Sequence, residues 1–123
     1  MATRSVVIVK DNDKENWIYH HWDGYPEGVG FDLVRRSKKF KSYEDKWYGD
    51  DITNKLVKDT TDSYEITNGY HKDIDFLYVI DCQEEKIKCF RITEYNWNTY
   101  KDIINSGNKI DLLELFKKEE VIK

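Results

Sequence analysis

The stretch from residue 20 to residue 30, His-His-Trp-Asp-Gly-Tyr-Pro-Glu-Gly-Val-Gly, constrains the fold of this chain more than any other. It contains the only proline of the chain, three of its six glycines and two of its three histidines. Pro26 lacks a backbone donor and biases Tyr25 toward an extended backbone. The glycines permit left-handed backbone conformations and close packing. The stretch therefore predicts an irregular corner between two regular elements.

The segments that flank this corner predict a strand on one side and a helix on the other. Residues 5–10 are a β-branched run and residues 16–22 a second run with aromatic residues, separated by a polar turn at 11–15. We expect the two runs to pair as an antiparallel hairpin. Alternation along the second strand places His20 and His21 on opposite faces of the sheet.

The rest of the chain predicts short helices, a second hairpin and a helical C-terminus. The expected helices lie at 31–40, 43–48, 51–57, 98–106 and 108–118, and the further strands lie at 64–67, 76–82 and 86–92. We expect Gly49 to close the helix at 43–48. These elements predict an α+β fold in one domain over residues 1–123. It would be an antiparallel sheet built from two hairpins, with short helices between them and two C-terminal helices.

Charge and cysteine content disfavour a duplex-binding protein, a disulfide-rich protein and a thiolate zinc protein. The net charge of −4 disfavours duplex nucleic acid as a partner, because duplex binding needs a basic face. Cys82 and Cys89 are too few for a disulfide framework or a thiolate zinc site, so we expect both to be reduced and buried. The sequence has no recognisable signal peptide or membrane-spanning run, which predicts a cytoplasmic protein without a membrane partner.

Two kinds of chemistry compete for the corner. A metal site would use His20, His21, Asp23 and Glu27, but adjacent histidines on a strand point apart. General acid–base work would pair Asp23 with Glu27 or His21, yet no nucleophile motif accompanies them. We therefore expect a protein without a cofactor, a metal or catalytic residues. A small hydrolase or a metal-dependent enzyme is the alternative.

A binding role suits the corner and its surroundings better. Gly28 and Gly30 precede a helix that is followed by a basic cluster, a pattern that favours a phosphate-bearing ligand. Trp and Tyr are abundant, and such side chains dominate protein interfaces. The interface candidates are Trp22, Tyr25, Tyr43, Trp47, Tyr48, Tyr95, Trp97 and Tyr100. The predicted binding residues are His21, Trp22, Asp23, Tyr25, Glu27, Arg35, Arg36, Lys38 and Lys39.

The N-terminal third of the chain resembles a family of small proteins encoded by phages, prophages and mobile elements. Members open with a Thr-Arg-Ser strand, which is matched here at residues 3–5. A Tyr-x-His-Trp-Asp-Gly-Tyr-Pro segment follows, matched from Tyr19 onward, and then a helix. The resemblance covers residues 3–36 and carries no catalytic or ligand assignment with it.

The resemblance implies a biological context, phage infection of a bacterial host, and does not imply a particular reaction. Small phage proteins of this kind are often counter-defence factors that act by binding in the host-cell cytoplasm. One expectation is an inhibitor that docks on a bacterial immune protein or complex, similar to an anti-CRISPR protein. The alternative is an oligomeric protein that sequesters a nucleotide second messenger of the cyclic or ADP-ribose type. Whether the chain forms a homo-oligomer is left open by the sequence.

Overall fold

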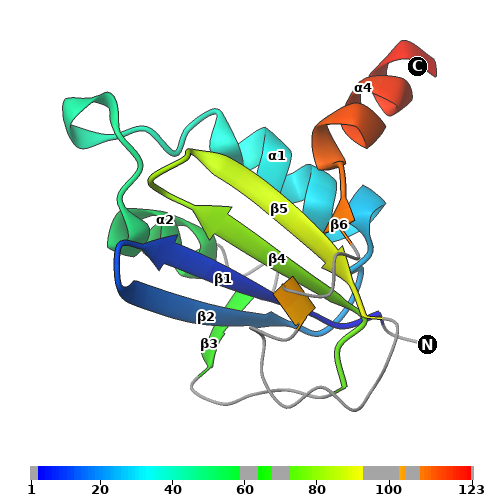
Figure 1. Cartoon of the computed structure of the whole chain (residues 1–123), viewed down its shortest axis with the longest axis horizontal. Coiled ribbons are helices and arrows are strands. Elements are labelled where there is room, and N and C mark those ends of the chain that lie inside the picture. The colour runs from blue at the N-terminus through cyan, green and yellow to red at the C-terminus, as the bar shows by residue number, and fades with distance from the viewer. Residues whose placement is uncertain (1–2, 59–63, 68–72, 93–102, 105–108, 123) are drawn as a thin grey trace.

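The computed structural model describes residues 3–58, 64–67, 73–92, 103–104 and 109–122 of the chain. Within these residues the fold is α+β, with a six-stranded mixed sheet in the order β3-β2-β1-β4-β5-β6 (Figure 1). The strands are β1 (Ser5–Asp11), β2 (Lys14–His20), β3 (Tyr64–Thr67), β4 (Phe76–Asp81), β5 (Lys86–Arg91) and β6 (Lys109–Ile110). The two predicted hairpins, β1–β2 and β4–β5, are both present.

The prediction of a purely antiparallel sheet is wrong, because the two hairpins join through a parallel pair. Strand β1 runs parallel to β4, with Ser5 opposite Phe76 and Lys10 opposite Asp81. Its residues Val6 to Val9 are all buried, as expected for a central strand that is covered on both faces. Alternation of apolar residues does not report strand direction, so the sequence pattern was compatible with either arrangement.

Three helices are described: α1 (Phe31–Ser37), α2 (Gly49–Lys58) and α4 (Leu112–Ile122). The corner contains a π-helical turn, η1 (Pro26–Gly30), that continues into α1. The helix predicted at 43–48 is only a short 3-10 turn, η2 (Tyr43–Asp45), because Glu44 and Asp45 adopt left-handed backbone angles. Gly49 therefore does not close that helix but begins α2.

The C-terminal region agrees with the prediction in part. Helix α4 begins at Leu112, later than predicted, because the two-residue strand β6 precedes it. Of the helix predicted at 98–106, only residues 103 and 104 are described, and both are helical. The helices of the described part are too short and too polar to cross a bilayer.

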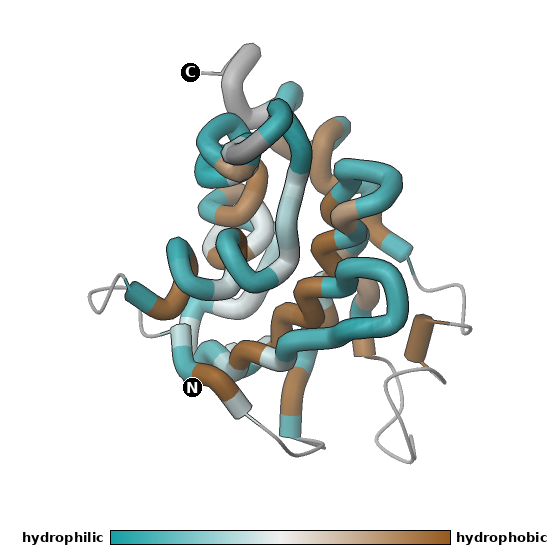
Figure 2. Tube along the Cα trace, turned by 90° about the vertical axis from the view of Figure 1, so that its left-hand side faces the viewer, coloured by the Kyte–Doolittle hydropathy of each residue, from teal (hydrophilic) through white to brown (hydrophobic). Residues whose placement is uncertain are grey.

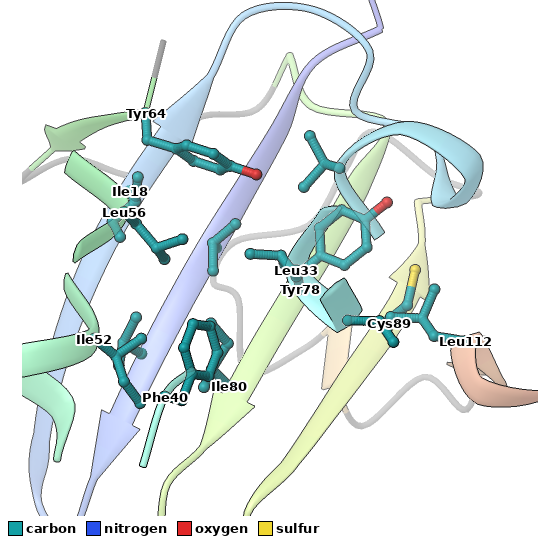
Figure 3. Packing of buried hydrophobic residues seen from close by; sticks show 14 of the residues in the cluster. Ile18, Leu33, Phe40, Ile52, Leu56, Tyr64, Tyr78, Ile80, Cys89 and Leu112 are labelled. Carbon is teal, nitrogen blue, oxygen red and sulfur yellow. The ribbon is translucent and has the colours of Figure 1, made fainter. Parts of the chain in front are cut away.

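Buried side chains form a layer on each face of the sheet, and the three helices cover one of these layers. Figure 3 shows this layer, where Leu33 of α1 lies by Tyr78 of β4, Leu56 of α2 by Ile18 of β2, and Leu112 of α4 by Cys89 of β5. The other face carries a second cluster around Leu77 and contains residues of β1, β2, β4 and β5. In Figure 2 the hydrophobic segments run through the strands, whereas the connecting loops are hydrophilic. Both cysteines are buried and unbridged, as predicted.

Candidate functional site

The corner begins by folding across the N-terminal end of β1. The Gly24 N–H donates to the Thr3 carbonyl at 2.9 Å, and its carbonyl accepts the buried Tyr78 hydroxyl at 2.6 Å. A Cβ atom on Gly24 would lie 2.9 Å from both the Thr3 oxygen and the Ser5 Cβ. Such distances are too short for a side chain, so glycine is required where the corner crosses the strand.

The second half of the corner is a closed backbone turn. Asp23 has a φ of 53°, and its carbonyl accepts the Val29 N–H at 2.8 Å. The Gly28 N–H donates to the Tyr25 carbonyl at 2.9 Å. A Cβ on Gly28 would lie 2.2 Å from the Asp23 oxygen, which excludes any other residue in this geometry. The glycines and the proline of the stretch therefore have a structural role, as the sequence predicted.

The turn sorts its side chains into buried and exposed positions. Gly24 and Pro26 are buried, while Asp23 and Glu27 are exposed. Trp22 is 48% exposed and Tyr25 is 39% exposed, so both aromatic side chains present area to solvent. We call the outward-facing set the corner surface, and it consists of His21, Trp22, Asp23, Tyr25, Glu27 and Glu65.

The corner surface is acidic. The Tyr25 hydroxyl donates to Asp23 Oδ1 at 3.3 Å, and the negative charge of Asp23 raises the pKa of this phenol. His21 Nε2 lies 3.2 Å from Glu65 Oε2. The corner surface thus contains three carboxylates, two exposed aromatic rings and one histidine.

Glu65 is the member of this surface that local sequence did not reveal. It belongs to β3 and reaches the corner because Tyr19 of β2 pairs with Glu65 across the antiparallel ladder. The ring of His21 packs edge-on against Tyr19, with ring centres 4.6 Å apart. Strand pairing over a long sequence separation thus completes a surface whose other residues are contiguous.

The two adjacent histidines point to opposite faces, as alternation predicted. His20 is 5% exposed and packs against the ring of Tyr64, with centres 4.7 Å apart. Ser5 is fully buried and pairs with His20 across β1–β2. Neither His20 Nδ1 nor Ser5 Oγ has a hydrogen-bond partner in the described part of the chain. The described residues also contain no group of three histidine, cysteine or acidic side chains placed to hold a metal ion.

The predicted arginines do not join the corner surface. Arg36 Nε lies 2.8 Å from Asp32 Oδ2, and its guanidinium sits over the Tyr64 ring of β3. Arg35 instead lies over the ring of Phe116 in α4, 5.5 Å from its centre. Residues next to each other in α1 thus contact elements on different sides of the helix.

The predicted lysines are also separate from the corner. Lys38 and Lys39 are exposed beyond the C-terminal end of α1, whereas the corner precedes its N-terminal end. A helix of this length spans roughly 10 Å. The N–H groups of Gly28 and Val29 already donate to backbone carbonyls of the corner, so neither is available to an anion in this conformation.

The remaining interface candidates are spread over the molecule. Trp47 is half-buried and packs edge-on against Phe40, with ring centres 5.2 Å apart. Tyr48 is half-buried too. Tyr95, Trp97, Tyr100 and the side chain of Tyr43 lie outside the described residues.

No protein-family model matches the chain, and neither the comparison with curated proteins nor that with solved structures finds a match.

Proposed function

We propose that this chain is a phage or prophage counter-defence protein that acts by binding and docks on a bacterial immune effector through the corner surface. The observation that carries the proposal is the exposure of Trp22 and Tyr25, 48% and 39%, on a backbone held at both ends by hydrogen bonds. Trp and Tyr on a pre-organised backbone are typical binding hot spots, because little conformational entropy remains to be lost.

The charge of the corner surface selects the kind of partner. Asp23, Glu27 and Glu65 give it a negative charge, and the whole chain carries −4. Immune effectors that handle nucleic acid need basic channels to neutralise phosphates. An acidic surface with exposed aromatic rings complements such a channel, and charge complementarity of this kind favours fast and selective association.

The sequestration of a nucleotide messenger receives less support from the described residues. That alternative relied on the glycine loop with Arg35, Arg36, Lys38 and Lys39. The N–H groups of Gly28 and Val29 and both arginines are engaged within the molecule, whereas Lys38 and Lys39 are exposed at the far end of α1 from the corner. The resemblance of residues 3–36 to small phage proteins is compatible with both functions. The docking proposal therefore rests on the corner surface itself.

The proposal is tested by the double substitution Trp22→Ala/Tyr25→Ala. Binding to a purified CRISPR effector should weaken by at least about thirtyfold, because one hot-spot side chain contributes roughly 2 kcal/mol or more. Phages that carry the double variant should lose protection in a host with that immune system. The matched control is Ile104→Ala, which removes a side chain with a similar exposure of 38% that is not part of the corner surface.

Both variants should keep the melting temperature of the parent protein, so that a loss of binding is not a loss of folding. Wild-type inhibition by the double variant would refute the proposal. A higher melting temperature in the presence of a cyclic dinucleotide or ADP-ribose, with intact nucleotide recovered after denaturation, would favour sequestration instead.

A further inference from the structure

A second surface of the molecule is a groove of about 620 Å³ that lies along the outer edge of β5. Helix α1, the start of α4 and Trp47 also line it. Leu113 is 60% exposed. The apolar residues that line the groove are Val34, Trp47, Ile87, Ile110, Leu112 and Leu113. The groove shares no residue with the corner surface.

The edge of β5 inside this groove is open. Strand β6 pairs only with Cys89 and Phe90, because the chain leaves the sheet after Ile110 to begin α4. Residues Lys86, Ile87 and Lys88 pair with β4 on their inner side. On their outer side no described residue pairs with them. The groove thus occupies the place where a longer β6 would lie.

We propose that this groove is a strand-addition site, in which an extended segment of a partner protein pairs antiparallel with β5 in line with β6. Every second residue of an edge strand directs its N–H and C=O outward, and these groups bind an added strand through main-chain hydrogen bonds. The pockets beside such an edge then select side chains at alternate positions.

The side of β5 that faces the helices selects an apolar residue. Ile87 pairs with Ile80 and packs against the cluster beneath the helices. Opposed residues in a ladder share a face, so the partner residue opposite Ile87 points into the groove. There it meets the half-buried Trp47 and the exposed Leu113, and an aliphatic side chain would cover both.

The other side of β5 selects an acidic residue. Lys86 is exposed and forms no ion pair among the described residues. Lys88 is already paired, because its Nζ lies 3.8 Å from Asp81 Oδ2 and 3.4 Å from Glu84 Oε1. Opposite charges across a ladder are favourable. The occupant is therefore a segment in which an acidic residue opposite Lys86 stands next to an apolar residue opposite Ile87.

The same lysines disfavour a second copy of this chain as the occupant. Two β5 edges paired antiparallel about Ile87 would place Lys86 opposite Lys88 of the second copy, and like charges opposed in a ladder are destabilising. Lysines on an open edge are a common protection against such self-pairing. A partner that presents an acidic residue to Lys86 avoids this repulsion.

A labelled synthetic peptide, Thr-Glu-Val-Glu-Val-Glu-Thr, tests the proposal in fluorescence polarisation with the full chain. We expect it to bind at least about fivefold more tightly than the same peptide with Lys in place of Glu, although the net charge of the protein repels acidic peptides. Lys86→Glu should reverse this preference, whereas Lys58→Glu, an exposed lysine on α2, should leave it unchanged. Amide exchange at residues 86–88 should slow in the complex.

Four results would each overturn the proposal. They are undetectable binding of the acidic peptide, equal binding of a peptide of the same composition without alternation, an unchanged preference in Lys86→Glu, and unchanged amide exchange in β5. The Trp22→Ala/Tyr25→Ala variant should bind the peptide as the parent does, because its side chains lie outside the groove. Failure of the strand-addition site would therefore be distinguishable from failure of the docking proposal.

Discussion

At the scale of single residues, the shape of the corner depends on carbonyl oxygens that leave no room for a side chain. The Asp23 carbonyl lies where the Cβ of any other residue at position 28 would be. The Thr3 carbonyl has the same effect at position 24. Glycine is therefore required at positions 24 and 28 for the backbone conformation in which Trp22 and Tyr25 face solvent. These glycines do not indicate a flexible segment.

Gly28→Ala should lower the free energy of unfolding by roughly 2–4 kcal/mol, because the turn must open to admit the methyl group. Urea denaturation followed by far-UV circular dichroism would measure the change. The neighbouring Glu27→Ala is the control, and its exposed side chain should change stability by no more than about 0.5 kcal/mol. Equal stability of Gly28→Ala and the parent would show that the turn does not have this closed geometry.

The sequence predicted the corner as an irregular, glycine-dependent turn, but it could not show what the glycines avoid. The contacts at Gly24 come from Thr3 and Tyr78, whose positions depend on how β1 and β4 are arranged. The separation of the two histidines was predictable because it follows from alternation alone. The separation of Arg35 from Arg36 was not, since it depends on where α4 and β3 pack.

At the scale of elements, one carboxylate ties α2 to the two hairpin turns. Asp11 Oδ2 accepts the Gly49 N–H at 2.8 Å, and Oδ1 accepts a hydrogen from Gln83 Nε2 at 2.8 Å. It therefore acts as a cap for the N-terminus of α2 although it is 38 positions away. This distant cap explains why Gly49 begins a helix.

Asp11→Ala should reduce stability by about 1–2 kcal/mol, the usual effect of losing a helix cap. Asp13→Ala removes an exposed carboxylate from the same hairpin turn and should have little effect. Chemical denaturation of the two variants side by side measures the difference. An equal loss of stability in the two variants would show that the loss comes from removing a negative charge from the hairpin turn, and not from removing the cap of α2.

Local patterns predicted five of the described strands nearly at their observed places, because each strand has its own apolar run. They did not predict β6, whose two residues are too few for a pattern. The parallel pairing of β1 with β4 also escaped prediction, although the four consecutive buried residues of β1 are typical of a strand covered on both faces.

At the scale of the whole molecule, buried weak acids make stability depend on pH in the alkaline range. Burial raises the pKa of Cys82 and of Cys89 to about 12 from 9.0. Burial and the charge of Asp73 raise the pKa of Tyr19 to about 12 from 10.0. Burial also raises the pKa of Tyr78. Each group thus keeps its proton in the folded state where the unfolded chain has lost it.

The free energy of unfolding should therefore fall as the pH rises above about 9, since the unfolded state then binds fewer protons than the folded state. Below that pH the contribution of these groups is fully present. Each titrating group adds a slope of at most about 1.4 kcal/mol per pH unit. Urea titrations between about pH 7 and about pH 10.5 would measure the fall, and Cys82→Ala/Cys89→Ala should reduce its slope. An unchanged slope in that variant would contradict the assignment.

The parallel pairing of β1 with β4 also makes the fold depend on contacts between residues far apart in the sequence. Arg4 and Asp75, which flank this pair, are 71 positions apart and are joined by a hydrogen bond. Closing a loop of that length costs entropy before the contacts form, so folding should be slower than for two independent hairpins. The corner hydrogen bond from Tyr78 to Gly24 can form only after this closure. A nascent chain therefore presents no finished corner surface until β4 has left the ribosome and joined β1.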